Sequence, residues 1–296
     1  MDISDSGCRI TGSTRLTGLL GSPVRHSISP LMHNESFRIL GLDYVYLCFE
    51  VGEGSLERAV SGLKECGIAG FNLTMPNKTC IIPLLDRLSL SAELIGAVNT
   101  VVNENGMLSG YNTDGIGFMQ SVRDAGITVP GSVFTLMGGG GAASAISVQA
   151  AIDGISELNI FVRPQSRFYG RTQRTAKLIS SKTGCRVNVF DNADKAELKS
   201  SLQRSSLLIN ATSVGMSPHE DESIIEDTSL FDSHLTVADV IYHPMRTRLL
   251  REAEGAGCKT FNGMYMLLYQ GAEAFRLFTG RDMPVDIIRA KYFGRQ

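Results

Sequence analysis

The amino-acid sequence predicts an α/β fold that is divided into two domains. Strand and helix patterns alternate along most of the 296 residues, which is typical of folds built on a mainly parallel sheet. A chain of this length fits about two domains of roughly 150 residues each. The composition changes after the turn at 129–131, and strand–helix units repeat from there. We therefore expect one open α/β domain at 1–115, completed by C-terminal helices at 264–296, and a doubly wound domain at 116–263.

The hydrophobic pattern of the first part predicts its individual elements. Strands are expected at 44–51, 70–73, 98–102 and 107–111, and helices at 56–64 and 116–125. The last two strands are joined around Asn105 and Gly106, a strong hairpin signal because both residues tolerate positive φ. Near the C-terminus, 263–279 and 284–292 predict two helices with no strand after them. We expect these helices to pack on the first domain, which would make that domain discontinuous.

A glycine-rich turn opens the second domain. Residues 132–137 have the pattern of a buried strand, four glycines and two alanines follow at 138–143, and a helix pattern comes next. Read as G-x-G-x-x-A, the motif has Gly138 for the tight turn, Gly140 for close approach of the backbone to a pyrophosphate, and Ala143 for close helix–strand packing. The helix N-terminus offers free N–H groups to phosphates. We interpret this Rossmann-type unit as a dinucleotide site, with a flexible loop as the alternative.

The end of the second strand of this unit bears on which dinucleotide is bound. Residues 158–162 predict that strand, and no acidic residue follows to grip the ribose 2′-hydroxyl of NAD. Arg163, Ser166 and Arg167 follow instead, and guanidinium groups pair with phosphate in a bidentate manner. The loop therefore favours NADP. NAD remains open, as does the interpretation that these are solvated loop charges.

Composition and charge argue against several kinds of partner. The net charge is −2 and no run of like charge occurs, which argues against nucleic-acid binding, since that requires a basic surface. The N-terminal residues lack the pattern of a secretory signal. No apolar stretch approaches the ~18 residues of a membrane span. We expect a cytoplasmic protein without a membrane partner.

The cysteines and histidines predict neither disulfides nor a metal site. The cysteines are scattered without a C-x-x-C pair, which favours buried free thiols in a reducing compartment; they are Cys8, Cys48, Cys66, Cys80, Cys185 and Cys258. The histidines lack ligand partners at useful spacing. We expect capping or surface roles, and no metal, for His26, His33, His219, His234 and His243.

Three polar strings interrupt the apolar elements of the first domain. They lie at 21–30, at 72–78, and at 99–100 together with 112–115. Ser27 and Ser29 suit helix capping, and they suit equally the binding of a carboxylate at a helix N-terminus. Taken singly, Lys78 fits a surface charge and Asp114 a helix N-cap. Because ligands of open α/β sheets bind outside the carboxyl ends of strands, the strings together suit a sugar-like acid.

At these strings the chain resembles the shikimate dehydrogenase family, and over most of its length the quinate/shikimate dehydrogenase branch. Six motifs in order carry the resemblance: Ser-Ile-Ser-Pro at 27–30, Asn-Leu-Thr-Met-Pro-Asn-Lys at 72–78, Gly-Ala-Val-Asn-Thr at 96–100, Tyr-Asn-Thr-Asp-Gly at 111–115, Asn-Ala-Thr-Ser-Val-Gly-Met at 210–216 and Gln-Gly-Ala at 270–272. The resemblance implies a substrate-binding catalytic domain at 1–115 with 264–296, an NAD(P)-binding domain at 116–263, and a monomer or homodimer.

The resemblance also implies residue roles. Catalysis would fall to Lys78 as base, paired with Asp114. The substrate would be held by Ser27, Ser29, Tyr46, Thr74, Asn99 and Gln270. The cofactor would be lined by Gly138, Gly139, Gly140, Gly141, Ala142, Arg163, Arg167, Ser213, Val240, Tyr242 and Gly263.

The chain departs from the family after the second Rossmann strand. Relatives carry Asn-Arg-Arg-Asp or Asn-Arg-Thr there, whereas this chain has Val-Arg-Pro-Gln at 162–165. The missing Asp weakens an NAD assignment, and the missing Asn-Arg-Thr leaves NADP without its full clamp.

The implied activity is reversible NAD(P)-dependent oxidation of shikimate, and also of quinate, to the 3-dehydro compound. This would link the protein to aromatic amino-acid precursors or to quinate use. Lys78 would act as the base, or as an electrostatic holder with a proton relay. The alternatives are a family member acting on another cyclic polyol or amino analogue, and a non-catalytic dinucleotide-binding sensor; the presence of both Lys78 and Asp114 argues against the sensor.

Overall fold

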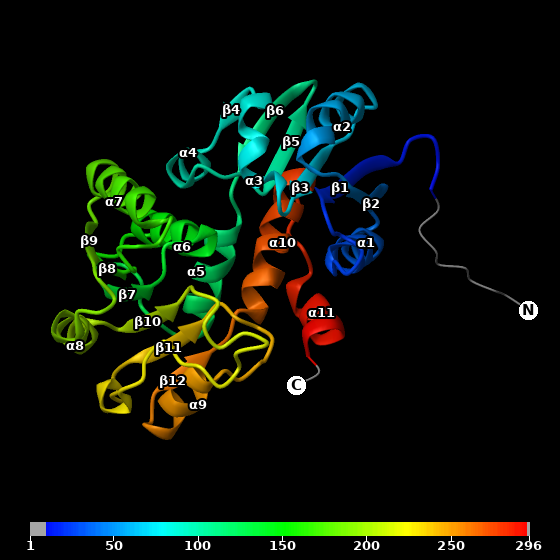
Figure 1. Ribbon diagram of the computed structural model, residues 1–296. Coiled ribbons are helices and arrows are strands. Elements are labelled where there is room, and N and C mark those ends of the chain that lie inside the picture. The colour runs from blue at the N-terminus through cyan, green and yellow to red at the C-terminus, as the bar shows by residue number, and fades with distance from the viewer. Residues whose placement is uncertain (1–9, 295–296) are drawn as a thin grey trace, which may run out of the picture. The chain divides into compact units, whose positions relative to one another are not determined.

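The computed structural model describes residues 10–294, and it confirms the α/β class with two six-stranded sheets (Figure 1). The chain divides into two compact units, each holding one sheet. The first unit contains the residues up to Thr113 together with those from Gln270 onward, and the second spans Asp114–Tyr269. The chain therefore leaves the first unit once and returns to it within a C-terminal helix.

The sheet of the first unit has the strand order β2-β1-β3-β5-β6-β4. Its strands are β1 (Arg15–Gly21), β2 (Tyr44–Glu50), β3 (Gly70–Leu73), β4 (Arg87–Leu88), β5 (Thr100–Glu104) and β6 (Met107–Tyr111). Strand β1 runs parallel to β2 and β3, while β5 runs antiparallel to β3 and β6. The hairpin predicted between β5 and β6 is confirmed, with φ of 54° at Asn105 and 88° at Gly106.

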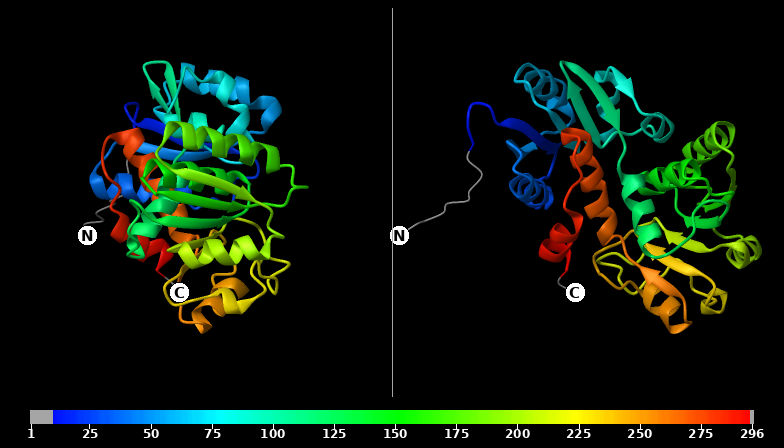
Figure 2. Two further views of the ribbon diagram at one scale, coloured as in Figure 1. Left: turned by 90° about the vertical axis from the view of Figure 1, so that its left-hand side faces the viewer. Right: turned by 180° about the vertical axis from the view of Figure 1, so that it is seen from behind.

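Helices cover both faces of this sheet (Figures 1 and 2). On one face, Phe37 of α1 (Ser29–Leu40) stacks on Phe275 of α10 (Met264–Thr279). On the other face, Leu56 and Val60 of α2 (Glu53–Glu65) pack with apolar residues of β1, β3 and β5. The shorter helices are α3 (Asn77–Cys80), α4 (Leu90–Ile95) and α11 (Val285–Ile288), with a π-helical turn at Arg289–Phe293. The predicted helices at 56–64, 263–279 and 284–292 are thus confirmed.

The sheet of the second unit is parallel throughout, in the order β12-β11-β10-β7-β8-β9. Its strands are β7 (Val133–Met137), β8 (Glu157–Phe161), β9 (Arg186–Phe190), β10 (Leu207–Asn210), β11 (Thr236–Asp239) and β12 (Lys259–Phe261). The strand order reverses between β7 and β10, the arrangement of a doubly wound Rossmann-type sheet. This confirms the predicted fold of the second part.

Two sets of helices sandwich this sheet (Figure 2). One set is α5 (Asp114–Asp124), α6 (Gly141–Ile152) and α7 (Tyr169–Lys182); the other is α8 (Lys195–Arg204) and α9 (Arg248–Gly255). Leu198 of α8 and Leu249 of α9 share one buried cluster with Met137, Leu208 and Val237 of the strands. The buried apolar faces of the helices on the sheet supply the main favourable free energy of this unit.

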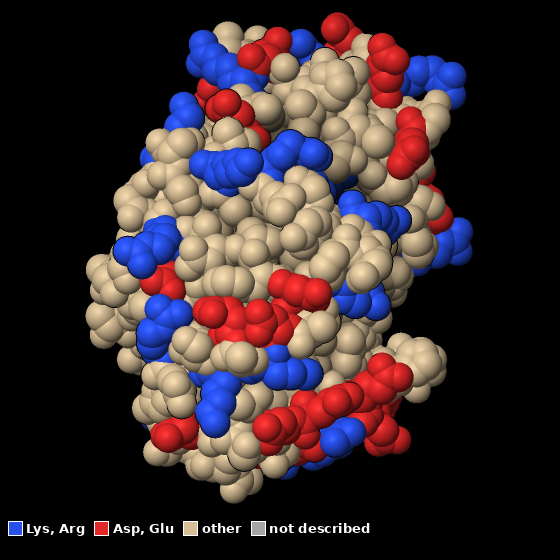
Figure 3. Space-filling view, turned by 60° about the vertical axis from the view of Figure 1, so that its left-hand side comes forward, with Lys and Arg blue, Asp and Glu red and all other residues tan. Residues whose placement is uncertain are grey.

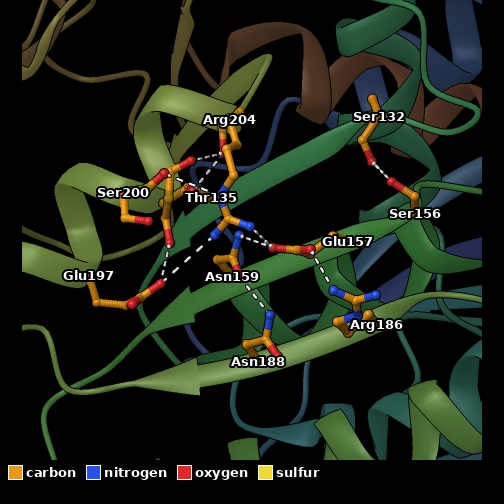
Figure 4. Close-up of polar contacts among 12 residues, drawn as sticks. Ser132, Thr135, Ser156, Glu157, Asn159, Arg186, Asn188, Glu197, Ser200 and Arg204 are labelled. Atoms are coloured by element: carbon orange, nitrogen blue, oxygen red, sulfur yellow. Dashed lines mark hydrogen bonds and ion pairs between the residues drawn. The ribbon is translucent and has the colours of Figure 1, made fainter.

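A polar network closes the amino ends of β8 and β9 (Figure 4). The carboxylate of Glu157 accepts a 3.0 Å hydrogen bond from Asn159 and pairs with Arg186 at 3.4 Å and Arg204 at 3.2 Å. Asn188 donates to the Asn159 side chain at 2.8 Å. Because ligands bind at the carboxyl ends of such strands, we assign this network to stability alone.

The five cysteines that the structure describes are free, as predicted. Cys185 and Cys258 are buried and Cys48 is half-buried, but Cys66 and Cys80 are exposed. The prediction of buried thiols is therefore wrong for those two, and Cys8 lies outside the described residues. Within 10–294, no helix combines the length and apolar character needed to cross a membrane.

Candidate functional site

All three polar strings extend from one edge of the first sheet. Strands β1 and β3 are parallel, so both end at this edge. Strand β5 is antiparallel to β3 and begins here, with Thr100 opposite Asn72. Strand β6 ends here, with Tyr111 opposite Thr100. The topology thus gathers Thr74 and Asn99 beside the loop that carries Ser27.

A chain of buried hydrogen bonds connects these strands. The Tyr46 hydroxyl donates to the Asn72 side-chain oxygen at 2.8 Å. The Asn72 amide donates to the Thr100 hydroxyl at 2.9 Å and to the Asn99 carbonyl at 3.1 Å. The Asn99 amide donates to the Thr113 hydroxyl at 3.0 Å, and its oxygen accepts from the Thr113 N–H at 2.8 Å. All five residues are buried, so the side chain of Asn99 is held in one orientation.

The start of α1 carries Ser27 and Ser29, but neither is the N-cap residue of the helix. Ile28 is the N-cap residue and makes no side-chain cap bond. The N–H of Ser29 donates to the Ser27 hydroxyl at 3.2 Å, Pro30 has no N–H, and the N–H of Leu31 bonds to the Ile28 carbonyl at 3.0 Å. The capping prediction is therefore wrong for Ser29, because few N–H groups are left for its hydroxyl to satisfy, whereas the Ser27 hydroxyl accepts from the first N–H of the helix.

The two hydroxyls instead face strand β2. Burial raises the pKa of Tyr46 well above its usual value, and a hydrogen bond with Ser29 opposes that rise. Burial likewise raises the pKa of the Cys48 thiol, opposed by a hydrogen bond with Ser27. Tyr46 is fully buried, and its hydroxyl forms hydrogen bonds with both Ser29 and Asn72.

His33 of α1 lies under this arrangement, in the aromatic core. It was expected at the surface or in a cap, and that prediction is wrong: its exposed fraction is 1%. Its ring stacks on Tyr46 with centroids 4.3 Å apart and planes 13° apart. Phe275 and Phe278 of α10 also contact it. Burial lowers the pKa of His33 from 6.5 to about 3, and its Nδ1 atom has no hydrogen-bond partner in the part of the chain that the structure describes.

The segment after β3 fixes Thr74 and Lys78. The N–H of Thr74 donates to the Leu20 carbonyl at 3.1 Å, and the N–H of Asn77 closes a turn onto the Thr74 carbonyl at 2.9 Å. Asn77 is buried and its amide donates to the Val51 carbonyl at 2.7 Å. The carbonyl of Lys78 accepts from the Val98 N–H at 2.8 Å. Lys78 therefore sits, half-buried, on a backbone that is held from two sides.

Gln270 lies in α10, where this helix approaches α1. A Cβ atom added to the next residue, Gly271, would lie 2.7 Å from the Met32 side chain and 3.9 Å from His33 Nε2. Glycine at this position lets the Met32 side chain pack closely against α10. Gln270 itself is half-buried, and it belongs to the same unit as Ser27 and Asn99.

The glycine-rich turn of the second unit has two halves with different roles. Gly138 has φ of 118°, and a Cβ on Gly139 would lie 2.5 Å from the Thr172 hydroxyl. Beside Gly140 and Gly141 an added Cβ would meet no atom within 4 Å. The protein itself therefore requires the first two glycines. The next two leave space over the N-terminus of α6, whose N-cap makes no side-chain bond. Free N–H groups beside open space fit the phosphates of a dinucleotide.

The neighbouring loops carry the other residues expected at a cofactor. A Cβ on Gly263 would lie 2.0 Å from the Val240 carbonyl oxygen, so this position admits glycine alone. Ser213 and Tyr242 are exposed. Ala142, at the start of α6, is half-buried.

Asp239 holds two of these loops together, a role that the sequence did not reveal. The buried carboxylate accepts from the Asn210 amide at 3.2 Å, the Ile241 N–H at 3.0 Å and the Thr247 hydroxyl at 2.8 Å. Burial raises the pKa of Asp239, and these hydrogen bonds oppose the rise. Its position at the end of a strand, before the segment of Val240, was the available signal.

The loop after β8 presents Arg163 and Arg167 at the surface. Both are exposed, and neither forms an ion pair with a carboxylate among residues 10–294. The guanidinium of Arg167 lies 4.7 Å from the centroid of the Phe168 ring. Arg171, on the first turn of α7, lies against the same ring at 5.2 Å. Sequence reasoning missed Arg171, although it follows the loop residue Arg167 by only four positions.

Asp114 is the first residue of α5 and is counted with the second unit. A carboxylate there stabilises the helix N-terminus. A Cβ on the next residue, Gly115, would lie 2.4 Å from the Ala145 carbonyl oxygen, so α5 and α6 pack closely. The pairing of Asp114 with Lys78 joins residues of two units and stays a prediction.

The surface charges follow no single sign. On the face drawn in Figure 3, Lys and Arg alternate with Asp and Glu. In the described part of the chain, no group of three His, Cys, Asp or Glu side chains is placed to hold a metal ion.

The second unit combines a parallel Rossmann-type sheet with a glycine-rich turn that fits phosphates. The first unit carries a chain of buried polar side chains at one edge of its sheet. Together these features define a two-domain dinucleotide-binding protein. The family model described as the shikimate dehydrogenase substrate binding domain matches residues 19–101. The one described as the shikimate 5′-dehydrogenase C-terminal domain matches residues 263–291.

Individual relatives agree along nearly the whole chain. Shikimate dehydrogenase (NADP(+)) of Listeria monocytogenes serotype 4b (strain F2365) is 48% identical over 285 residues, which cover 96% of this chain and 98% of that one. The crystal structure of shikimate 5-dehydrogenase from Listeria monocytogenes in complex with shikimate and NAD matches with a TM-score of 0.92 at 49% identity, over 95% of this chain and 97% of that chain. Quinate dehydrogenase from Corynebacterium glutamicum in complex with NAD gives a TM-score of 0.83 at 29% identity, over 95% and 99%. The chain belongs to the shikimate dehydrogenase family.

Proposed function

We propose that this protein catalyses the reversible NADP-dependent oxidation of shikimate to its 3-dehydro compound. The observation that carries the proposal is the buried hydrogen-bond chain from Tyr46 to Thr113, which orients hydroxyl and amide groups at one sheet edge. Such groups suit a polyhydroxylated ring acid. The likeness to a shikimate dehydrogenase (NADP(+)) over 96% of the chain supports the same substrate.

The residues of the first unit would bind the substrate. We assign its hydroxyls and carboxylate to Ser27, Ser29, Thr74, Asn99 and Gln270. Asn99 is preoriented because Thr113 accepts from its amide and donates to its oxygen. A group that is already held in its binding orientation loses little conformational entropy when substrate binds. Tyr46 would support this set from below, through Ser29 and Asn72.

Lys78 would handle the proton. When a ring carbinol is oxidised, its hydroxyl proton must leave, and Lys78 would accept that proton or hold the developing charge while Asp114 relays it. The dinucleotide, when bound, supplies the hydride chemistry. The turn of α3 holds the Lys78 backbone through Val98 and the neighbouring Asn77, which would keep the ammonium in place.

The second unit would hold the dinucleotide over residues 138–142, with Ser213, Val240, Tyr242 and Gly263 along the neighbouring strand ends. NADP is favoured over NAD because two guanidiniums that form no ion pair with a carboxylate of residues 10–294, those of Arg163 and Arg167, follow β8 where an acidic residue would grip a free 2′-hydroxyl. Quinate is a second substrate candidate, on the likeness to a quinate dehydrogenase. The free thiols suit the cytoplasm.

Initial rates with shikimate and quinate, each against NADP⁺ and NAD⁺, test the proposal. We expect the highest kcat/KM for shikimate with NADP⁺. Absence of reduced nicotinamide with every pair would overturn the proposed activity, and a higher value for quinate or NAD⁺ would overturn that part alone.

The role of Lys78 is tested by Lys78→Ala. We expect kcat to fall roughly 10²–10⁴-fold, the usual effect of losing a general base, with a smaller change in KM. Lys64→Ala, which removes a lysine from the last turn of α2, is the control and should leave kcat unchanged. An unaltered kcat for Lys78→Ala would exclude Lys78 from the chemical step.

A further inference from the structure

Arg171 lies beside the glycine-rich turn without an adequate partner. Its Nη2 atom reaches the Gly139 carbonyl and the Ser144 hydroxyl, both at 3.4 Å, which is long for hydrogen bonds. Its Nε atom is buried and has no hydrogen-bond partner among residues 10–294. A buried guanidinium donor that stays unsatisfied costs free energy. The present contacts therefore leave this cation short of acceptors.

The charged neighbour that acts on Arg171 is another cation, Arg167. Arg167 repels it, and burial together with that repulsion lowers the pKa of Arg171. Neither arginine forms an ion pair with a carboxylate in the described chain. Both guanidiniums lie against the Phe168 ring, at 4.7 Å and 5.2 Å from its centroid. Two neighbouring cations of this kind are stabilised most by an anion bound between or beside them.

The position of Arg171 indicates which anion fits. It stands on the first turn of α7, which follows β8 and the loop after that strand. In Rossmann-type domains this loop contacts the adenosine ribose. The contacts of Arg171 to Gly139 and Ser144 bring it to the glycine-rich turn. Arginine binds a phosphate with two parallel N–H donors. In Arg171 the Nε and Nη2 donors form such a pair, and they make only the two long contacts described above.

We infer that Arg171 is a specificity-determining ligand of the 2′-phosphate of NADP, acting with Arg167 in place of the motif that this chain lacks. The inference rests on the proposed use of NADP. On binding, the guanidinium exchanges its long contacts with the Gly139 carbonyl and Ser144 for two charge-assisted bonds to phosphate oxygens. Arg167 neutralises the remaining charge, and the Phe168 ring keeps both side chains extended along the loop.

Binding calorimetry with two nucleotide fragments tests this assignment without turnover. Adenosine 2′,5′-bisphosphate and adenosine 5′-monophosphate differ only in the 2′-phosphate. We expect the protein to bind the bisphosphate more tightly. In Arg171→Gln, which keeps an amide donor near Gly139, the bisphosphate should bind about ten- to a hundredfold more weakly, the usual effect of losing a charge-assisted bond. The monophosphate should change less than about threefold, since it lacks that bond.

Two further variants exclude a general structural effect. Arg171→Lys keeps the charge without the planar fork and should recover part of the lost affinity. Lys177→Ala removes an exposed charge from the same helix and should bind both fragments as the unaltered protein does. A similar loss for both fragments in Arg171→Gln, no loss for either, or equal binding of the two fragments by the unaltered protein would overturn the inference. Fragment binding that follows Arg171 while shikimate is not oxidised would overturn the proposed activity and leave this assignment standing.

Discussion

The buried His33 makes the stability of the first unit depend on pH. The folded protein holds His33 with a pKa of about 3, whereas the exposed side chain has 6.5. Between these values the unfolded chain binds more protons than the folded one, so stability falls as the pH falls. The contribution of neutral, buried His33 to the free energy of unfolding is present above pH 6.5 and is lost progressively as the pH falls toward 3.

The magnitude follows from the two pKa values. Protonation of His33 in the unfolded chain lowers the free energy of unfolding by about 0.2 kcal/mol at pH 7 and by about 2 kcal/mol at pH 5. At pH 5 the folded protein carries almost no proton on His33, so this figure depends on the unfolded pKa alone. Tyr46 is the titratable group stacked on His33; burial raises its pKa, so it stays neutral throughout.

His33→Phe isolates this contribution. The phenyl ring keeps the stack on Tyr46 and removes the unpartnered Nδ1 atom, so little stability should be lost at pH 7. We expect urea denaturation, followed by circular dichroism, to show that the free energy of unfolding falls between pH 7 and pH 5 by about 2 kcal/mol less in His33→Phe than in the unaltered protein. His26→Gln, at an exposed position, is the control and should keep the original pH dependence.

Nuclear magnetic resonance of the histidine rings gives a direct check. The signal that disappears in His33→Phe should not shift between pH 8 and pH 5. If that ring titrates near pH 6.5, the assignment of His33 as a buried neutral group is wrong. It is equally wrong if His33→Phe loses as much stability between pH 7 and pH 5 as the unaltered protein does.

Two further predictions concern the second unit. Asp239→Ala leaves the donors of Asn210, Ile241 and Thr247 without their acceptor, and urea denaturation should show a free energy of unfolding lower by about 3 kcal/mol or more. Asp239→Asn should lose less than half of that. Because the folded pKa of Asp239 is raised, the unaltered protein loses stability as the pH rises through that pKa, so the difference between it and Asp239→Asn should shrink. Glu157→Gln should lower the free energy of unfolding by less than about 1 kcal/mol, since Arg186 and Arg204 are substantially exposed and such pairs contribute little. Glu157 lies at the amino ends of the strands, so kcat should not change; a fall in kcat would contradict the purely structural role given to this network, and a larger loss of stability would contradict the small contribution expected of its ion pairs.

Local signals explain why much of the fold could be predicted from the sequence. The hairpin at Asn105 and Gly106 and the turn at Gly138 depend on backbone conformations that few residues other than glycine and asparagine adopt. Each signal lies within a few residues and needs no distant partner. The alternation of strands and helices then fixes the parallel sheet of the second unit.

Long-range packing explains what could not be predicted. His33 looks like a surface residue of α1, because the side chains that bury it, Phe275 and Phe278, are supplied by α10 more than two hundred residues later. The hydroxyl of Ser29 looks like a cap until its contact with Tyr46 is known. Arg171 is unremarkable as one of several basic residues on α7, and only its place beside Gly139 distinguishes it.

The topology of the first sheet explains why the polar strings converge. In a purely parallel sheet only the carboxyl ends of strands would meet at this edge. The antiparallel β5 and β6 also bring the start of β5 and the end of β6 there, so Asn99 lies beside Thr113 although fourteen positions separate them. Thr113 is the last residue of its segment of the first unit, and the Cα atom of Asp114 is necessarily about 3.8 Å from that of Thr113. A residue counted with the second unit is thus tied by one peptide bond to the buried network of the first.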